Sequence, residues 1–321
     1  MKESLRALAV AGVAVATLAM APAAAAPRIF VTNEKSDDVS VIDGATHRVI
    51  DRIPVGRRPR GVTVAPDGRR VYVASSDADT VTVIEADTLR VSATAAAGRD
   101  PEGIAAGRDG RALYVVNENE STVTVLTLPA LTIRARITVG TEPETAVVSP
   151  DGRRVVVSNE TSNEVHVIDT ADDRVVGRVA VPRNPRGMRF TADSRLLYVA
   201  SEQAHVVSEI DMTTLAVLRS APTGGQRPVD VVLSPDGGRL YVSHGQSGDV
   251  RVLDRARLEV VATIPVGPRA WWMALTPDGG RLYVTVGRAG EVAVVDTARL
   301  AVSDRIAVGQ LPWGVAIADT P

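Results

Sequence analysis

One aromatic position recurs along this chain at an almost constant interval. It is occupied by Phe30, Tyr72, Tyr114, Val156, Tyr198, Tyr241 and Tyr283, spaced 42 residues apart except for one step of 43. Most copies follow a turn of the Pro-Asp-Gly type and lie in a short strand rich in β-branched residues. A period near 42 built of strands and turns is typical of a β-propeller with one four-stranded blade per repeat. The chain is therefore predicted to be all-β, with the recurring rings packed between blades.

The two ends of the chain carry complementary strands. Strands that start with a Pro-x-Gly motif or its variant begin at Pro59, Pro101, Pro143, Pro185, Pro228, Ala270 and Pro312. The last of them, residues 312–318, has no Tyr-Val strand after it, and the strand around Phe30 has no Pro-x-Gly strand before it. We therefore predict that residues 312–318 complete the blade formed by residues 28–56. This pairing would close a ring of seven antiparallel blades and leave no open edge.

The first 25 residues differ in composition from the rest. Lys2 and Arg6 come before an uncharged apolar run, and small alanines follow near residue 25. This order is typical of a secretory signal peptide, and the run is shorter than the roughly 20 residues that a membrane-spanning helix needs. We therefore expect a signal peptide at 1–25, a propeller domain at 26–321, and a periplasmic mature protein without a membrane span.

Composition excludes several classes of function. The formal net charge is −2 over 321 residues, so the strongly basic surface typical of nucleic-acid binding is not expected. The chain has no cysteine, which excludes disulfides, thiolate metal sites and a c-type haem attachment motif. The sequence leaves the oligomeric state open.

The middle residue of the Pro-x-Gly motif varies while its neighbours repeat. The loops on this side of the ring frame the mouth of the central channel, where propellers usually bind. In chain order the position is occupied by Arg60, Glu102, Glu144, Arg186, Val229, Trp271 and Trp313. Four charged residues followed by three apolar ones predict a mouth suited to a ligand with a flat apolar part and a polar part. Alternatively, the charges form solvent-exposed ion pairs, each contributing less than about 1 kcal/mol.

Three tryptophans and one histidine also fall in this region. Trp271, Trp272 and Trp313 lie at or beside the variable position, and large rings with a polar N–H often mark recognition surfaces. The alternative is that they fill the channel beside the closing blade. His244 replaces the Asn, Ser or Val of other repeats and is expected at the edge of the mouth. It has no third ligand at zinc spacing, so a zinc site is not expected.

An acidic sector lies in the second set of mouth loops. One repeat position carries Glu34, Glu118, Glu160 and Glu202. Clustered carboxylates can hold a hard cation such as Ca²⁺, and Glu118 and Glu160 are the candidate ligands. The sequence has no Asp-x-Asp-x-Asp loop, however, which favours a solvated acidic face or a docking patch for a basic partner over a metal site.

The repeats resemble a known family over essentially the whole mature chain. Phe30-Val31-Thr32-Asn33, Tyr283-Val284-Thr285 and Pro277-Asp278-Gly279 are similar to the YVTN-family β-propeller repeat. A signal peptide followed by seven repeats looks most like the PQQ-dependent catabolism-associated β-propeller proteins. This resemblance implies an accessory role beside quinoprotein alcohol oxidation. The tryptophan docking motifs of quinoprotein dehydrogenases are absent, so no bound cofactor, PQQ included, is expected.

Three functions remain as hypotheses. The sequence favours a non-catalytic periplasmic binding or scaffold propeller that engages a small molecule or a partner protein at the channel mouth. No nucleophile motif is found, but seven-bladed propellers also host enzymes, so a metal-assisted lactonase-like hydrolase is an alternative. A structural interaction protein of the cell envelope is the third.

Overall fold

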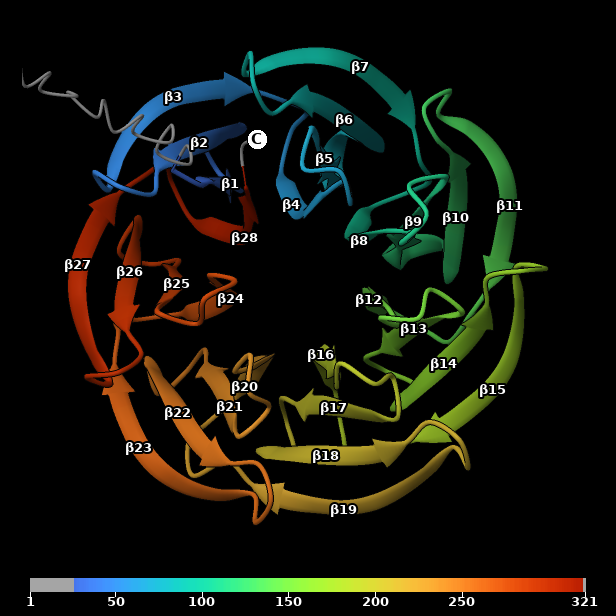
Figure 1. Cartoon of the computed structure of the whole chain (residues 1–321). Coiled ribbons are helices and arrows are strands. Elements are labelled where there is room, and N and C mark those ends of the chain that lie inside the picture. Colours follow the sequence, from blue (N-terminus) through green and yellow to red (C-terminus); the bar gives the residue numbers. More distant parts are fainter. Residues whose placement is uncertain (1–25, 320–321) are drawn as a thin grey trace, which may run out of the picture.

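The structure is a computed structural model that describes residues 26–319. Within this range, seven four-stranded antiparallel sheets surround a common axis, as Figure 1 shows. The predicted signal peptide at 1–25 lies outside the described residues. No helix in the described part of the chain has the length and apolar character needed to cross a membrane.

Each sheet is one blade, and we number the blades from the N-terminus, giving the strands of each from the axis outward. Blade 1 contains β28 (Pro312–Ala318), β1 (Arg28–Asn33), β2 (Asp38–Asp43) and β3 (Arg48–Pro54). Blade 2 contains β4 (Pro59–Val64), β5 (Arg70–Ser75), β6 (Thr80–Glu85) and β7 (Arg90–Ala96). Blade 3 contains β8 (Pro101–Ala106), β9 (Ala112–Asn117), β10 (Thr122–Thr127) and β11 (Thr132–Thr138). Blade 4 contains β12 (Pro143–Val148), β13 (Arg154–Asn159), β14 (Glu164–Asp169) and β15 (Arg174–Ala180).

The remaining three blades follow the same order. Blade 5 contains β16 (Pro185–Phe190), β17 (Leu196–Ser201), β18 (Val206–Asp211) and β19 (Ala216–Pro222). Blade 6 contains β20 (Pro228–Leu233), β21 (Arg239–His244), β22 (Asp249–Asp254) and β23 (Glu259–Pro265). Blade 7 contains β24 (Ala270–Leu275), β25 (Arg281–Val286), β26 (Glu291–Asp296) and β27 (Ala301–Ala307). Two 3₁₀ turns, η1 (Ser76–Ala78) and η2 (Glu118–Glu120), lie in loops of blades 2 and 3.

The predicted closure of the ring is confirmed. β28 pairs antiparallel with β1, with Ile317 opposite Ile29 and Val315 opposite Val31. In Figure 1 the red β28 lies beside the blue β1 at the inner end of blade 1. The first and last strands thus form one sheet, which removes the two free edges that an open ring would expose.

The recurring tyrosines hold the blades together as predicted. Each ring is at most 2% exposed. Tyr283 of β25, for example, packs in one cluster with Ile29 and Val315 of blade 1. Burial of a large aromatic ring between sheets contributes several kcal/mol, which explains why the position repeats.

The turns and the strand ends define two faces of the ring. In blade 6 the turn between β20 and β21 is held by Asp236, whose Oδ1 accepts the Gly238 N–H at 2.9 Å, and Gly237 has φ of 68°. We call this side the turn face. On the opposite side Pro228, at the start of β20, pairs with His244, at the end of β21. We call that side the mouth face, because the variable residues follow there.

Candidate functional site

A bulge at the start of each inner strand turns the variable residue toward the axis. On β4 the pairing with β5 jumps from Pro59 to Val62, so Arg60 and Gly61 have no partner in the register. Equivalent jumps occur on β8, β12, β16, β20 and β24. Bulges redirect side chains in this way. They bring charged and aromatic residues from different blades together across the channel.

Arg60 joins blades 1, 2 and 3. Its guanidinium forms an ion pair with Glu102 of blade 3, and its Nη2 lies 3.1 Å from Glu34 Oε1 of blade 1. The same group lies over the ring of Trp313, 5.7 Å from its centroid. A single arginine therefore ties three neighbouring blades at the mouth end of the channel.

Arg186 makes a second and wider set of contacts. Its Nη1 lies 2.7 Å from Glu144 Oε1 and 2.9 Å from Glu160 Oε1, and its Nε contacts Glu202. The guanidinium also lies 5.4 Å from the centroid of Trp271 in blade 7. Val229 is the variable residue of the intervening blade 6, and it is fully buried.

Arg269 completes the set. Its guanidinium lies 4.6 Å from the centroid of Trp271 and its Nη2 lies 3.4 Å from Glu34 Oε2. Trp271 is thus in cation–π contact with both Arg186 and Arg269. We call the whole group the ion-pair layer, and it consists of Glu34, Arg60, Glu102, Glu144, Glu160, Arg186, Glu202, Arg269, Trp271 and Trp313.

The ion-pair layer is buried, and this corrects one expectation. The predicted alternative of ion pairs is right about the partners, but wrong about their exposure to solvent. Glu102 and Glu144 are 0% and 3% exposed, and the side chains of Arg60 and Arg186 are 13% and 16% exposed. Buried pairs lose hydration, so removing one partner from such a pair costs about 3–5 kcal/mol. The layer closes the mouth end of the channel with charge.

Burial also shifts the ionisation of the layer. Burial, reinforced by the charge of Glu144, raises the pKa of Glu160 to about 8 and holds the pKa of Glu102 well above its ordinary range. Burial acts in the same direction on Glu34, but Arg60 and Arg269 outweigh it and lower the pKa of that carboxyl. Glu102 and Glu160 therefore hold protons more readily than Glu34 does, although each of them also contacts an arginine.

The tryptophans lie deeper than expected. Trp313 is 3% exposed, so it offers little surface at the mouth. Trp272 lies 5.0 Å from Trp313 between ring centroids and lines a cavity in the channel. Its predicted position at the mouth is wrong, because its bulged strand turns it below the layer. The alternative that tryptophans fill the channel describes this pair better, while Trp271 belongs to the layer.

His244 is not at the edge of the mouth, contrary to expectation. It is 0% exposed. Its Nε2 lies 2.8 Å from Thr223 Oγ1 in the preceding loop, and its Nδ1 lies 3.2 Å from Asp249 at the start of the next strand. In blade 1, Asn33 makes the equivalent links to Gly309 and Asp38. His244 therefore joins the loop before blade 6 to β22 through side-chain contacts, and it is not available to a ligand.

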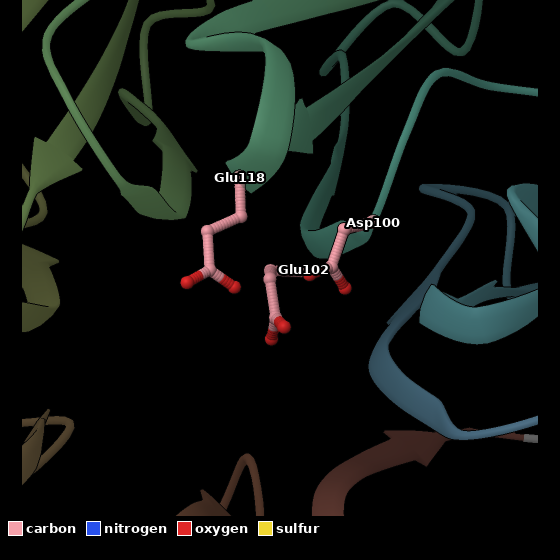
Figure 2. A group of neighbouring side chains, drawn as sticks. All are labelled: Asp100, Glu102 and Glu118. Carbon is pink, nitrogen blue, oxygen red and sulfur yellow. The ribbon is translucent and has the colours of Figure 1, made fainter.

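Three carboxylates gather beside the layer. Oxygens of Asp100, Glu102 and Glu118 lie within 4.8 Å of one another. Figure 2 shows the Glu118 carboxylate directed toward Glu102. Asp100 also accepts a hydrogen bond of 2.8 Å from Asn119, and burial raises the pKa of Glu118. Three such oxygens could hold a hard cation.

The acidic group differs in membership from the predicted one. Glu160, the second predicted ligand, lies in another blade, where it binds Arg186 and accepts a hydrogen bond of 2.8 Å from Asn184. Asp100 takes its place, and sequence reasoning did not identify it as a ligand. The sequence feature that could have pointed to Asp100 is its position directly before Pro101, in a loop that was already predicted to lie at the mouth.

Seven residues before the inner strands rim the mouth in an unusual conformation. All have positive φ between 52° and 62°, and they are Arg58, Asp100, Glu142, Asn184, Arg227, Arg269 and Leu311. Residues other than glycine adopt this region at a cost of roughly 1 kcal/mol each. The conformation is repeated while the side chains differ, so the rim is a rigid frame with a variable surface.

Comparison with known proteins places the chain among propellers. The family model described as YNCE-like beta-propeller matches residues 4–110, and the model described as lactonase, 7-bladed beta-propeller matches residues 88–214. Each covers less than half of the chain. No curated protein sequence matches it.

Solved structures agree in fold at low sequence identity. Hydrazine synthase from Kuenenia stuttgartiensis is 22% identical, with a TM-score of 0.74 over 82% of this chain and 95% of that one. A functionally unknown protein from Desulfotomaculum acetoxidans is 17% identical, with a TM-score of 0.82 over 92% and 99%. A putative 6-phosphogluconolactonase from Bacteroides fragilis is 18% identical, with a TM-score of 0.76 over 92% and 98%. With its strand order and closed ring, the chain is thus a seven-bladed β-propeller protein, similar in part to the YNCE-like and lactonase propeller families.

Proposed function

We propose that the chain is an exported, non-catalytic binding propeller that serves PQQ-dependent alcohol oxidation. The observation that carries the proposal is the ion-pair layer, where charged and aromatic side chains from six of the seven blades converge at one end of the channel. Buried charges cost free energy to assemble, and a scaffold alone does not need them. The resemblance to the PQQ-dependent catabolism-associated propellers supplies the pathway.

The mouth face above the layer has two sectors of opposite charge. The acidic sector extends over blades 2 to 4 and includes Asp77, Asp100, Glu118 and Glu142, and Arg58 lies 3.5 Å from Asp77 and 3.4 Å from Asp100 within it. The basic sector includes Arg227, Arg269, Arg288 and Lys35, with Trp271 beneath Arg269. A partner that carries both signs, or a flat anion over the basic sector, fits this distribution.

Calorimetry with PQQ and with a PQQ-dependent alcohol dehydrogenase tests this proposal. Arg288 is exposed in a mouth loop and Arg239 is exposed on the turn face, which makes them a matched pair. Arg288→Glu is expected to weaken binding by about tenfold through charge repulsion, and Arg239→Glu to leave it unchanged. If neither probe shows saturable binding, the proposed role in PQQ-dependent oxidation is wrong. If the two variants have equal effects, the mouth face is not the binding surface.

The exported location has its own test. Expression of the full chain with its first 25 residues, followed by cell fractionation and intact mass measurement, is expected to give a periplasmic protein that begins near residue 26. A cytoplasmic protein that keeps residues 1–25 would contradict it.

A metal-assisted lactonase-like hydrolase is the second candidate. Asp100, Glu102 and Glu118 lie inside the region that matches the lactonase propeller family, and they are the residues that would hold the metal. A bound divalent cation would supply a Lewis acid for a lactone carbonyl. Glu118→Gln should then abolish both stoichiometric metal and lactone hydrolysis, whereas Glu120→Gln on the same 3₁₀ turn should not. Purified protein with neither metal nor hydrolysis would exclude this candidate.

A further inference from the structure

The central channel contains a cavity beneath the ion-pair layer. It has a volume of about 160 Å³ and is lined by residues of all seven blades. Nearly all of these residues lie one to three positions beyond the variable residue, on the turn-face side of the ion-pair layer. Trp313 is the member of the layer that contributes to the lining. The layer therefore forms the roof of the cavity.

The channel opens toward the turn face. Glu102 and Glu144 in the roof are almost fully buried, whereas residues 62–64 at the lower end of β4 are partly exposed. Arg189, which lines the cavity from β16, is exposed. Burial lowers the pKa of Arg108, and the positive charge of Arg189 lowers it further. Arg108 lies in the turn that follows β8. Arg189 thus lies at the lower opening, close to the turn face.

The lining combines an apolar body with unpaired positive charge. Trp272, Trp313, Met188 and Met273 supply rings and thioethers. Within the described part of the chain, neither Arg189 nor Arg108 forms a salt bridge or donates a side-chain hydrogen bond. Arg189 is the arginine that lines the cavity. A free guanidinium group beside rings and thioethers favours a carboxylate attached to a compact apolar group.

The acidic group in the lining does not oppose an anion strongly. Asp230 is 3% exposed, and its two oxygens accept N–H groups of Val231 at 2.8 Å and Met273 at 3.0 Å. Burial raises the pKa of this carboxyl to about 7, although Arg189 acts to lower it. The carboxyl is thus largely neutral in mildly acidic solution.

We propose that the channel below the ion-pair layer binds a small organic anion with a single aromatic ring or a similarly compact apolar group, and that the ligand enters from the turn face. The volume of the cavity is sufficient for one aromatic ring, because an apolar cavity of roughly 150 Å³ accommodates benzene. The ring would lie against Trp272 and Met273, and its carboxylate would face Arg189. This site is separate from the mouth and does not depend on the function proposed for it.

Benzoate is the probe, and benzamide is its neutral isostere. Titration of the full mature protein by calorimetry and tryptophan fluorescence is expected to show saturable benzoate binding at or below about 10 mM, a range that modest ligand efficiency allows for nine heavy atoms. Benzamide should bind at least several-fold more weakly, because it lacks the charge. No saturable binding of benzoate would overturn the proposal.

Two arginine variants locate the site. Arg189→Gln is expected to weaken benzoate binding about tenfold and to leave benzamide binding unchanged, since a charge-assisted hydrogen bond is lost. Arg183→Gln is the matched control, because Arg183 is also exposed and unpaired but lies in the mouth-face loop before the same blade. Both side chains are exposed, so both variants should fold, which thermal unfolding verifies. Equal effects of the two variants, or loss of benzamide binding as well, would contradict entry beside Arg189.

Discussion

His244 performs in blade 6 the task that asparagine performs in other blades. It links the preceding loop through Thr223 and the next strand through Asp249, as Asn33 links Gly309 and Asp38. A glycine in the preceding loop makes space in both cases, because a Cβ on Gly225 or Gly309 would lie 2.6 Å or 2.5 Å from the side chain. The residue differs between blades, but the structural role is the same.

Replacement of this histidine should therefore affect stability and not binding. His244→Leu removes the hydrogen bond to Thr223 and the contact with Asp249, and it is expected to lower the free energy of unfolding by about 2–3 kcal/mol. His244→Asn restores the residue type of other blades and should cost less than about 1 kcal/mol. Urea denaturation measures both. Equal losses would show that the hydrogen bonds of this position do not matter.

Asp230 gives a prediction about pH. The pKa of an aspartate in an unfolded chain is about 3.9, and burial raises it to about 7 in the fold. The native state therefore binds more protons between these values, and its free energy of unfolding should fall as the pH rises from about 4 to about 7, by up to about 4 kcal/mol.

Asp230→Asn removes this titration. The variant should therefore gain stability relative to the wild-type protein between about pH 5 and about pH 8, as denaturant unfolding at both values would show. Arg189→Gln removes a positive charge that lowers the pKa of Asp230. The free energy of unfolding of this variant should therefore fall more with rising pH than that of the wild-type protein. If the free energies of unfolding of the wild-type protein and Asp230→Asn change with pH in parallel, Asp230 is not the group responsible.

Sequence reasoning identified the residues of the layer except Arg269, but not their surroundings. Arg60, Glu102 and Arg186 were found because they vary at a repeat position. Their burial depends on contacts across the channel, such as that of Arg186 with Trp271, and no local pattern encodes these. Trp272 was misplaced for a related reason: adjacent residues in a bulge lie at different depths, and the sequence does not show the bulge.

At the scale of the strand, the closure of blade 1 was predictable because strand counting needs only the repeat. The register was not. β28 pairs regularly with β1 up to Val315, and then the register shifts so that Asn33 lies opposite Pro312. Such shifts follow from backbone geometry in the loop before the strand, where Leu311 has φ of 56°.

Removal of the closing strand should open the ring. A variant that ends before Pro312 loses all of β28, and it exposes the inner edge of β1 together with apolar residues such as Ile29. We expect loss of a cooperative unfolding transition and self-association, measured by calorimetry and light scattering. A variant that ends after Asp319 keeps the strand and should behave as the full chain does. Monomeric, cooperative unfolding of the shorter variant would refute the role of closure.

Across the whole molecule, the ion-pair layer joins blades that do not touch one another. Arg186 of blade 5 contacts Glu144 of blade 4 and Trp271 of blade 7. Arg60 does the same for blades 1 and 3 through Glu34 and Glu102. The repeat predicted seven equivalent blades, but this layer makes them unequal, with carboxylates in excess on one side and arginines and rings on the other.

Loss of the wider arginine tests this arrangement. Arg186→Met leaves Glu144 and Glu160 without their counter-charge, while Glu202 keeps Arg227, and the change is expected to destabilise the protein by about 3–5 kcal/mol at about pH 8. The loss should be smaller at about pH 5, because the carboxyls then take up protons. Arg183→Met, at an exposed site of the same blade, should change stability by less than about 0.5 kcal/mol. Thermal and urea unfolding at both pH values provide the measurement.

The composite blade 1 also governs the order in which the molecule can fold. A chain that emerges with its N-terminus first presents β1 with no partner on its inner side, and β28 follows about 280 residues later. Six blades can form as local hairpins, but the ring stays open until the last strand arrives. Closure is therefore a late, long-range step of high contact order, and the interval before it is when the chain is most exposed to misassembly.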